Sequence, residues 1–487
     1  MKCYILRCAL AATTYLLLYG CINLGPDYKQ PTTGFEIPKA YAYAPGAAEQ
    51  LAAGDRWWEI FGDDDLNRLA NDVLKNNWDI KQAAARVLEV RARYVQIRAG
   101  RFPDARISGS KDRRRIPERG TQPTQLQPAR MVDTYDLSGA ASFELDLWSR
   151  LAKASEAAWQ DILAEEENRR TVAQAVVAEA ISLYLQMEAV ERRLQIAHEN
   201  IAVFERSLQF VETRYRRGLI SVLDVRQAAR VLAQAQTLVP QLEQELGISQ
   251  QQLAVLLGRY PQSRAARRQP EDYYKRLPPV PPGLPSDLLK RRPDIRAAEI
   301  QLKSLNEQIG VAKAARFPTI TLTGSYGWRS EELSNLLRRE HVAWDLTAGI
   351  VQPIFDAGRL KARQREAEAR YQQAAAEYVK TLLNAFSDVE KALLIRKRQL
   401  DRRQREVKFL NEARETQRVA QNRYIRGLVI YLDVLNAQVT RFQAEDNLVL
   451  VDLAILQNRV ALHRALGGGW AQPEPVAVKD DGIFFNF

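Results

Sequence analysis

The sequence predicts a mainly helical protein with a membrane β-barrel portion, built from two similar halves that each contain two strands, a very long helix and a returning helix. Three observations predict this fold class. Similar segments recur about 215 residues apart, segments of about ten residues alternate between apolar and small polar side chains, and two stretches of roughly 70 residues contain neither glycine nor proline.

The internal repeat is visible in two pairs of segments. Residues 79–103 and 294–318 both begin with Asp-Ile and end with Arg-Phe-Pro. Residues 214–225 and 423–434 both begin with Arg-Tyr, contain Arg-Gly-Leu and end with Leu-Asp-Val. A repeat of this length indicates a duplicated structural half rather than a short solenoid unit.

The start of the chain has the features of an export signal. Lys2 and Arg7 supply a positive region, and the apolar run over residues 9–19 is too short to span a bilayer. We therefore expect a signal peptide over residues 1–20. The mean hydropathy of −0.35 excludes a polytopic helical membrane protein.

A candidate lipidation site follows. Residues 18–21, Leu-Tyr-Gly-Cys, resemble a bacterial lipobox with Cys21 as the acylated residue, although Tyr19 occupies a position that is usually small. A chance cysteine after an ordinary signal peptide is the alternative. Each buried methylene of an acyl chain contributes about 0.8 kcal/mol, so several chains give a stable anchor. Residues 21–56 carry proline, glycine and tyrosine without period and are expected to form a lipidated, extended tether.

The first repeat is expected over residues 57–257 and opens with Trp57-Trp58. A short helix to Leu69 is predicted, and then a longer helix over about 72–98 with apolar residues at helical spacing. Arg-Phe-Pro ends it, because the residue before proline disfavours the helical region.

Two alternating segments follow in each half. The predicted strands cover about 103–115 and 133–146 in the first half and about 318–330 and 343–353 in the second. An ordinary hairpin with one buried face would show the same alternation. The small polar residues of the second face and the aromatic residues near the strand ends favour membrane strands that line a wet lumen.

The longest predicted elements are two helical hairpins, over about 149–257 and 357–466. Each begins with a helix of roughly 68 residues, about 100 Å long, whereas helices of globular domains average about 11–12 residues. No compact domain can bury such rods, so they are expected to pack side by side as coiled coils. Each rod reverses at an Arg-Gly-Leu turn.

Three further segments complete the chain. Residues 258–285 are rich in proline and read as a linker between the repeats. The second repeat is expected over residues 286–466, and residues 467–487 form a C-terminal tail.

Four membrane strands cannot close a barrel, because open sheet edges are not tolerated in lipid and the smallest closed bacterial barrels have eight strands. The chain is therefore expected to oligomerise, with eight strands from two copies or twelve from three. The long helices start where the strands end, so they would continue the same wall as an α-barrel. Their length is about three times the roughly 30 Å of a bilayer core, which predicts a tunnel across a periplasm.

The sequence resembles the TolC-type outer membrane factors, and more narrowly the NodT-like lipoprotein branch that serves resistance-nodulation-division efflux pumps. The resemblance covers essentially the whole mature chain. It is carried by the lipobox, Trp57-Trp58, both Arg-Phe-Pro junctions, both Arg-Gly-Leu turns, residues 352–359 (Gln-Pro-Ile-Phe-Asp-Ala-Gly-Arg) and residues 465–470 (Ala-Leu-Gly-Gly-Gly-Trp). It implies a homotrimer in the outer membrane, with a twelve-stranded β-barrel, a twelve-helix tunnel, a periplasmic adaptor protein and an inner-membrane pump as partners.

The resemblance also implies a gate at the periplasmic end. In the family a tyrosine before the second turn bonds an aspartate after the first, and these positions match Tyr424 and Asp224. An arginine that adds a second tie in some members is replaced here by Val429, so a weaker lock is expected. Tyr424 could instead be a plain packing residue of the coil, and Asp224 could simply cap its helix.

Acidic rings at the aperture are implied by the same resemblance. The two family aspartates match Asp433 and Asn436, with Leu432 beside them as an apolar constriction. Only one acidic ring per trimer would remain, and strong cation affinity is not expected. Asp433 could alternatively cap the returning helix.

The turn residues are expected to meet the hairpin of the adaptor protein. The alternative is that the two leucines pack only within their own hairpins. The residues concerned are Arg217, Gly218, Leu219 and Ser221 at the first turn and Arg426, Gly427 and Leu428 at the second.

The function expected from these features is a passive outer membrane exit duct of a tripartite efflux pump that conducts small molecules. The alternatives are an exit duct for secreted polypeptides and a non-conducting, lipid-anchored coiled-coil scaffold. No catalytic motif, metal site or cofactor is predicted, because the three histidines lie far apart and no phosphate loop or nucleophile motif is present.

We attribute the net charge of +11 to basic, solvated helix faces rather than to a nucleic-acid-binding site. Residues 113–115, three consecutive arginines, are expected in an extracellular loop between the first two strands. There they would contact phosphates of the outer leaflet or be solvated.

Overall fold

The computed structural model describes residues 24–44, 56–116, 129–261, 273–274, 277 and 288–468. The predicted signal peptide, Cys21, most of the proline-rich linker and nearly all of the C-terminal tail lie outside these residues. Two compact units are present, each with segments from both sequence repeats. The strand-bearing unit comprises Met1–Thr32, Arg86–Glu165 and Ala297–Tyr378, and the second unit comprises Thr33–Ala85, Glu166–Arg296 and Val379–Phe487.

The helices confirm the internal duplication, because corresponding helices of the two halves have equal lengths. The pairs are α3 (Trp78–Ala99) and α7 (Pro293–Ala314) with 22 residues, α4 (Arg150–Arg216) and α8 (Arg359–Ile425) with 67, and α5 (Val222–Leu256) and α9 (Tyr431–Ala465) with 35. The short α6 (Leu288–Arg291) precedes α7. Among the described residues, no helix combines the length and the apolar character needed to cross a membrane.

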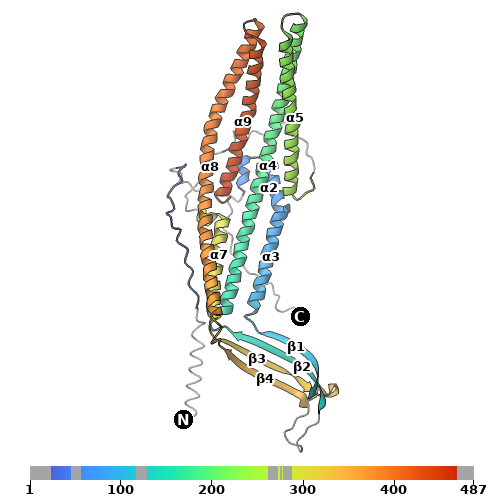
Figure 1. Cartoon of the computed structure of the whole chain (residues 1–487), viewed down its shortest axis with the longest axis vertical. Coiled ribbons are helices and arrows are strands. Elements are labelled where there is room, and N and C mark those ends of the chain that lie inside the picture. Colours follow the sequence, from blue (N-terminus) through green and yellow to red (C-terminus); the bar gives the residue numbers. More distant parts are fainter. Residues whose placement is uncertain are drawn as a thin grey trace, which may run out of the picture. The chain divides into compact units, whose positions relative to one another are not determined.

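The strands form one antiparallel sheet with the order β1-β2-β3-β4 (Figure 1). They are β1 (Asp104–Ile116), β2 (Arg130–Leu145), β3 (Thr319–Ser330) and β4 (Val342–Val351). Their bounds agree with the prediction to within a few residues.

One expectation about the strands was wrong. The three arginines 113–115 lie within β1 and pair with residues 131–133 of β2, rather than in a loop. A charged run can continue a strand because alternate side chains leave on opposite faces and need not share one environment.

The break between the predicted short helix and the longer helix that follows it was also misplaced, since it was expected near residues 70–71. The helix η1 (Trp57–Phe61) is followed by α2 (Asp64–Asn76), and the break falls at Asn77. The buried Asn77 takes an extended conformation, and its Oδ1 accepts the N–H groups of Asp79 at 2.8 Å and Ile80 at 3.1 Å. Asn77 therefore ends α2 and caps α3.

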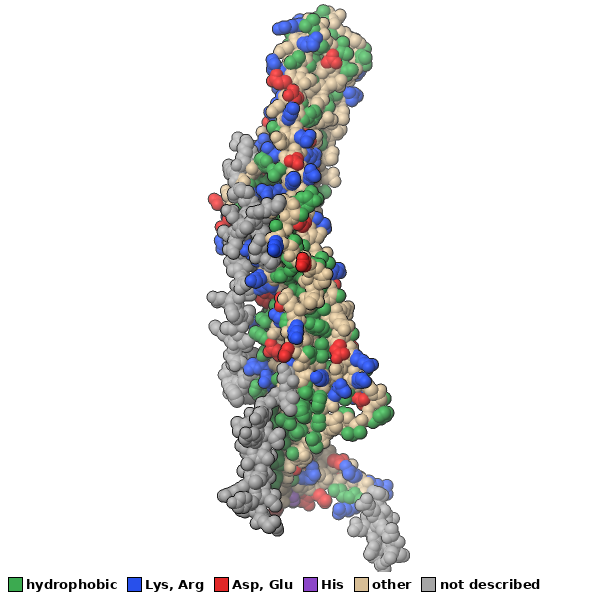
Figure 2. All heavy atoms as spheres, turned by 90° about the vertical axis from the view of Figure 1, so that its left-hand side faces the viewer, with side chains coloured by type: hydrophobic (Ala, Val, Ile, Leu, Met, Phe, Trp, Pro, Cys, Tyr) green, Lys and Arg blue, Asp and Glu red, His purple; other side chains and the backbone are tan. Residues whose placement is uncertain are grey.

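Mixed charges cover the long helices. On the face shown in Figure 2, Lys and Arg side chains are interspersed with Asp and Glu side chains. Many of them are neighbours one helical turn apart, such as Arg370 with Glu366 and Arg418 with Glu415. This pattern is typical of solvated helix faces.

Residues 24–44 have no regular secondary structure, but they are bonded to helices in both units. In the strand-bearing unit, Nε2 of Gln30 donates to the hydroxyl of Tyr378 at 2.8 Å. In the second unit, the ring of Phe35 packs edge-on against Phe386, and the N–H of Ala42 donates to Oε1 of Glu390 at 2.8 Å. These contacts hold the segment that was predicted as an extended tether along helices.

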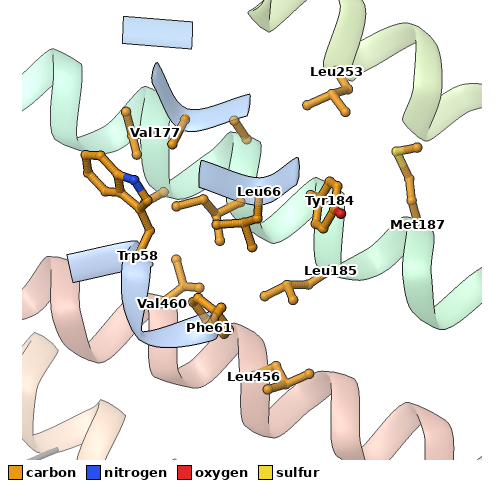
Figure 3. Close-up of a cluster of buried hydrophobic side chains, with 14 of the residues drawn as sticks. Trp58, Phe61, Leu66, Val177, Tyr184, Leu185, Met187, Leu253, Leu456 and Val460 are labelled. Atoms are coloured by element: carbon orange, nitrogen blue, oxygen red, sulfur yellow. The ribbon is translucent and has the colours of Figure 1, made fainter. Parts of the chain in front are cut away.

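The core of the second unit gathers side chains from η1, α2, α4, α5 and α9, among others (Figure 3). Trp58 and Phe61 come from η1 and are 1% and 0% exposed. They pack with residues from α2, α4 and α9, namely Leu66, Val177, Leu185, Leu456 and Val460. Fully burying side chains of this size contributes about 1.5–3 kcal/mol each, so the Trp-Trp motif anchors the start of the first repeat.

A carboxylate beside this core receives several hydrogen bonds. Oδ1 of Asp63 caps α2 by accepting the N–H groups of Asp65 at 2.7 Å and Leu66 at 3.2 Å. Oδ2 accepts the hydroxyls of Tyr184, at 2.9 Å, and Tyr273. Burial alone would raise the pKa of Asp63, but the hydrogen bonds from these donors outweigh it and lower the pKa below its usual value.

Replacing Asp63 with Asn should remove the part of the pH dependence of the second unit's stability that the Asp63 carboxylate causes. The pKa of Asp63 is lower in the folded chain, so its contribution to stability is complete above the unfolded pKa and is lost as the pH falls through the folded pKa. Asparagine keeps the cap but accepts the two hydroxyls as a neutral group, which should cost about 1 kcal/mol at pH 7. Thermal unfolding at pH 7 and pH 2.5 checks this, and an equal difference at both values would contradict it.

Candidate functional site

The strand register separates the side chains of the sheet onto two chemically different faces. On one face, Leu137 lies opposite Trp328 and Leu346 lies opposite Gly324. Trp344 and Leu346 are 72% and 78% exposed in the single chain. Other large apolar residues of this face include Ile107, Phe143, Ile320, Leu322, Tyr326 and Ile350. This face needs an apolar environment that a single chain does not supply.

The opposite face is mainly polar on all four strands. Ser108 lies opposite Ser138, and Thr323 lies between Ser142 and Thr347. Some charged groups on this face are paired, as in the 3.0 Å contact between the guanidinium of Arg329 and the carboxylate of Asp136. Sheets with one lipid-type face and one wet face are those of membrane barrels.

Four aromatic side chains lie on the apolar face near one end of the sheet. Tyr135 and Trp328 lie close to the positions where β2 begins and β3 ends, and Tyr326 lies opposite Trp344. The rings of Tyr326 and Trp328 pack edge-on with centroids 5.8 Å apart. Aromatic residues in such a band mark the membrane–water interface.

In the second unit, both long helices end in the same hydrogen-bonded turn. The N–H of Gly218 bonds the carbonyl of Tyr215, and the N–H of Leu219 bonds that of Arg214. Gly427 and Leu428 make the equivalent bonds at the second turn. The φ angles of Gly218 and Gly427 are +71° and +74°. These are Schellman motifs, which place a glycine in the left-handed region.

Both turns are exposed to solvent in the single chain. Leu219 and Leu428 are each 61% exposed, so the alternative that they pack only within their own hairpins is not supported. Arg217, Arg426 and Ser221 are exposed as well. Contact between these turns and an adaptor protein stays a prediction.

An aromatic cluster joins the ends of the two hairpins. The ring of Tyr424 on α8 is 7% exposed and packs against Phe210 of α4 and Tyr431 of α9, with centroids 6.3 Å and 5.6 Å away. The guanidinium carbon of Arg214 lies 5.1 Å from the centroid of Tyr424. The hydroxyl of Tyr431 bonds Oγ of Ser207 at 3.0 Å.

The predicted pair Tyr424 and Asp224 lies close together but is not bonded. The hydroxyl of Tyr424 is buried and has no hydrogen-bond partner among the described residues. Oδ2 of Asp224 accepts the N–H of Ser221 at 3.3 Å, as one half of a capping box. Burial raises the pKa of Tyr424, Arg214 opposes the rise and Asp224 adds to it. Capping by Asp224 is thus supported, while the lock stays a prediction.

The predicted aperture residues share one face of α9. Asp433 and Asn436 are exposed and lie one helical turn apart. Val434 and Leu435, which lie between them, are buried and belong to the same hydrophobic cluster as Tyr424 and Tyr431. Leu432 is half-buried. This face points away from the core of its own chain, and its role as an aperture stays a prediction.

The sequence reasoning missed Arg214 and Phe210. Arg214 opens the repeated Arg-Tyr motif, which is the signal that could have drawn attention to it. Its partner, however, is the tyrosine of the other repeat's motif, a pairing that is invisible without the fold. Among the described residues, no group of three or more His, Cys, Asp or Glu residues is arranged to hold a metal ion.

Comparison with known proteins adds three results. The family model described as "Outer membrane efflux protein" matches residues 69–259 and 284–468. The chain is 33% identical to the pyoverdine export outer membrane protein OpmQ of Pseudomonas putida, over 91% of this chain and 94% of that protein. It is also 33% identical to the cation efflux system protein CusC of Escherichia coli, over 94% of this chain and 97% of that one.

The fold has solved counterparts. A crystal structure of a membrane protein from Pseudomonas aeruginosa superimposes with a TM-score of 0.84 and 31% sequence identity. The match covers 91% of this chain and 100% of that chain.

Proposed function

Because the chain belongs to the outer membrane efflux protein family and is an outer membrane exit duct for efflux, we propose that three copies assemble into one channel. The observation that carries this proposal is the sheet of four strands, which has one lipid-type face, one wet face and two open edges, β1 and β4. Pairing β1 of one copy with β4 of the next removes both edges, as lipid requires. Three copies give twelve strands, enough to leave a passage inside.

The channel would conduct passively. Its lumen would be lined by the serine, threonine and paired charged side chains of the polar face, which offer hydrogen bonds to water without a fixed binding site. Energy for transport would come from an inner-membrane pump of the resistance-nodulation-division class, connected by a periplasmic adaptor protein. We infer no catalytic step in this chain.

The adaptor would dock on the two hairpin turns. Each turn presents an exposed leucine next to an exposed arginine, Leu219 with Arg217 and Leu428 with Arg426. An apolar anchor with a flanking arginine is the composition that protein interfaces favour. Asp433 would supply the single acidic ring of the aperture, with Asn436 and Leu432 beside it.

The cargo would be small molecules selected by the pump rather than by the duct. Two relatives that are equally similar to this chain are named for unlike cargoes, pyoverdine for OpmQ and cations for CusC. A duct of the same construction thus accompanies chemically different cargoes, which supports a channel that does not select.

Reconstitution of the purified full-length protein in planar bilayers tests this proposal. We expect a detergent-stable assembly with three times the mass of the chain, and discrete single-channel currents. A deletion strain should become sensitive to small toxic compounds while its polypeptide secretion is unchanged. Absence of conductance with a heat-insensitive gel mobility would indicate the lipid-anchored scaffold, and loss of secretion alone would indicate the polypeptide duct.

A further inference from the structure

A row of basic side chains lies on the apolar face of β1, where transport gives it no role. Lys111, Arg113 and Arg115 alternate along the strand and share the face of Ile107. Since alternate residues of a strand point to the same side, all three side chains leave the sheet on its lipid side. Cations on a lipid-facing surface are costly unless they reach water or anions.

The row begins at the aromatic band and extends away from it. Lys111 lies opposite Tyr135, and its Nζ is 5.2 Å from the centroid of that ring. At about 3.4 Å per residue, Arg113 and Arg115 lie roughly 7 Å and 14 Å farther along the strand. If the aromatic band marks the membrane interface, the two arginines occupy the headgroup layer beyond it.

The topology places this end of the sheet outside the cell. The helices α3 and α7 lead into β1 and β3, and α4 and α8 follow β2 and β4, so all four helices connect to the opposite end. In an outer membrane duct that extends into the periplasm, the helical end is periplasmic. The basic row therefore lies at the outer leaflet.

The charge of the row is only partly compensated. Nε of Arg113 lies 3.4 Å from Oδ1 of Asp133, its neighbour in the register. Lys111 and Arg115 lie opposite Tyr135 and Met131, so neither faces an acidic residue directly. Asp133 is diagonal to both, but it is the partner of Arg113. Two cations are left for an external anion.

Given the outer membrane barrel proposed above, on which this inference rests, we propose that Lys111, Arg113 and Arg115 bind the phosphate groups of a phosphorylated glycolipid in the outer leaflet. Arginine and lysine are the side chains that recognise phosphate, by paired hydrogen bonds and as a point charge respectively. The aromatic band below them would contact the upper part of the acyl chains, so that one lipid meets both surfaces.

Native mass spectrometry of the full-length, delipidated assembly tests this proposal. The probes are lipid A with two phosphates and the same lipid after enzymatic dephosphorylation. We expect the wild-type protein to bind the phosphorylated lipid at least about tenfold more tightly, because each cation near an anionic headgroup strengthens binding about fivefold. The double variant Lys111→Gln and Arg115→Gln should lose that preference.

The same strand offers a matched control. Arg106 and Arg114 lie on the polar face of β1, and Arg114 pairs with Asp112 at 3.1 Å. The double variant Arg106→Gln and Arg114→Gln removes the same charge but should change the lipid preference less than about twofold. The double variant Lys111→Arg and Arg115→Lys keeps both charges and should retain the preference for the phosphorylated lipid.

Three results would overturn the proposal: equal wild-type affinity for both lipids, an equal loss in the control variant, or displacement of the phosphorylated lipid by millimolar inorganic phosphate. The wild-type comparison decides the question even if the Gln variants do not assemble. Conductance is measured separately, so a protein that prefers the phosphorylated lipid without conducting would contradict the proposed function and leave this site standing.

Discussion

An arginine at position 346 should prevent assembly of the channel, whereas an arginine at position 347 should be tolerated. Leu346 lies in the middle of β4, opposite Gly324 on the apolar face, and is 78% exposed in the single chain. An arginine on the lipid face near the bilayer midplane costs about 2–4 kcal/mol, and each assembly would contain three of them. Such a cost is a large part of the stability of an ordinary fold.

The adjacent residue is the control. Thr347 lies opposite Thr323 on the polar face, so Thr347→Arg places the new charge in water. We expect normal assembly of this variant, with ion selectivity shifted toward anions because three positive charges are added to the lumen. Heat-dependent gel mobility reports assembly, and reversal potentials in a salt gradient report selectivity. Equal tolerance of both variants would mean that the two faces are assigned wrongly.

Removing the ring of Tyr424 should enlarge the resting conductance, whereas removing only its hydroxyl should not. The ring is buried against Phe210, Arg214 and Tyr431 and holds the end of the second hairpin on the first. Truncation of a buried aromatic ring to alanine costs about 3–5 kcal/mol. The hydroxyl has no hydrogen-bond partner among the described residues, so Tyr424→Phe removes no bond.

This expectation differs from that of the family resemblance, in which a bond between Tyr424 and Asp224 closes the gate. The resemblance predicts that Tyr424→Phe combined with Asp224→Ala enlarges the currents. Single-channel recordings of Tyr424→Ala, Tyr424→Phe and Asp224→Asn separate the two accounts, because asparagine preserves the cap that Asp224 provides at the start of α5. A larger conductance in Tyr424→Phe alone would restore the hydroxyl lock.

Much of the fold could be predicted because its signals are local and long. A run of roughly 70 residues without glycine or proline can hardly be anything but a helix. The glycine of each Arg-Gly-Leu turn takes the left-handed conformation that ends a helix, as Gly218 and Gly427 do. Alternation with a period of two located all four strands to within a few residues.

Two features were predicted wrongly because neighbouring residues carried conflicting local signals. The break at Asn77 was placed about six residues early, because Asn71 and Asp72 are also residue types that can cap a helix. The arginines 113–115 were assigned to a loop, because charge was weighed more heavily than the strand that continues through them.

The sequence by itself therefore determined the order, type and length of the elements and the positions of the turns, since each depends on residues near one another in the chain. It also determined the duplication, since similar segments can be compared without knowing the fold. Only the tertiary structure decided which residues of β1 to β4 lie opposite one another and which side chains surround Tyr424. The register joins β2 to β3 across roughly 180 positions of the chain, and packing joins Tyr424 to Phe210 across more than 200. The alternation within a strand indicates which face is apolar, but a shift of the register by two residues keeps that face unchanged. The local pattern therefore does not determine which residues of two strands lie opposite one another.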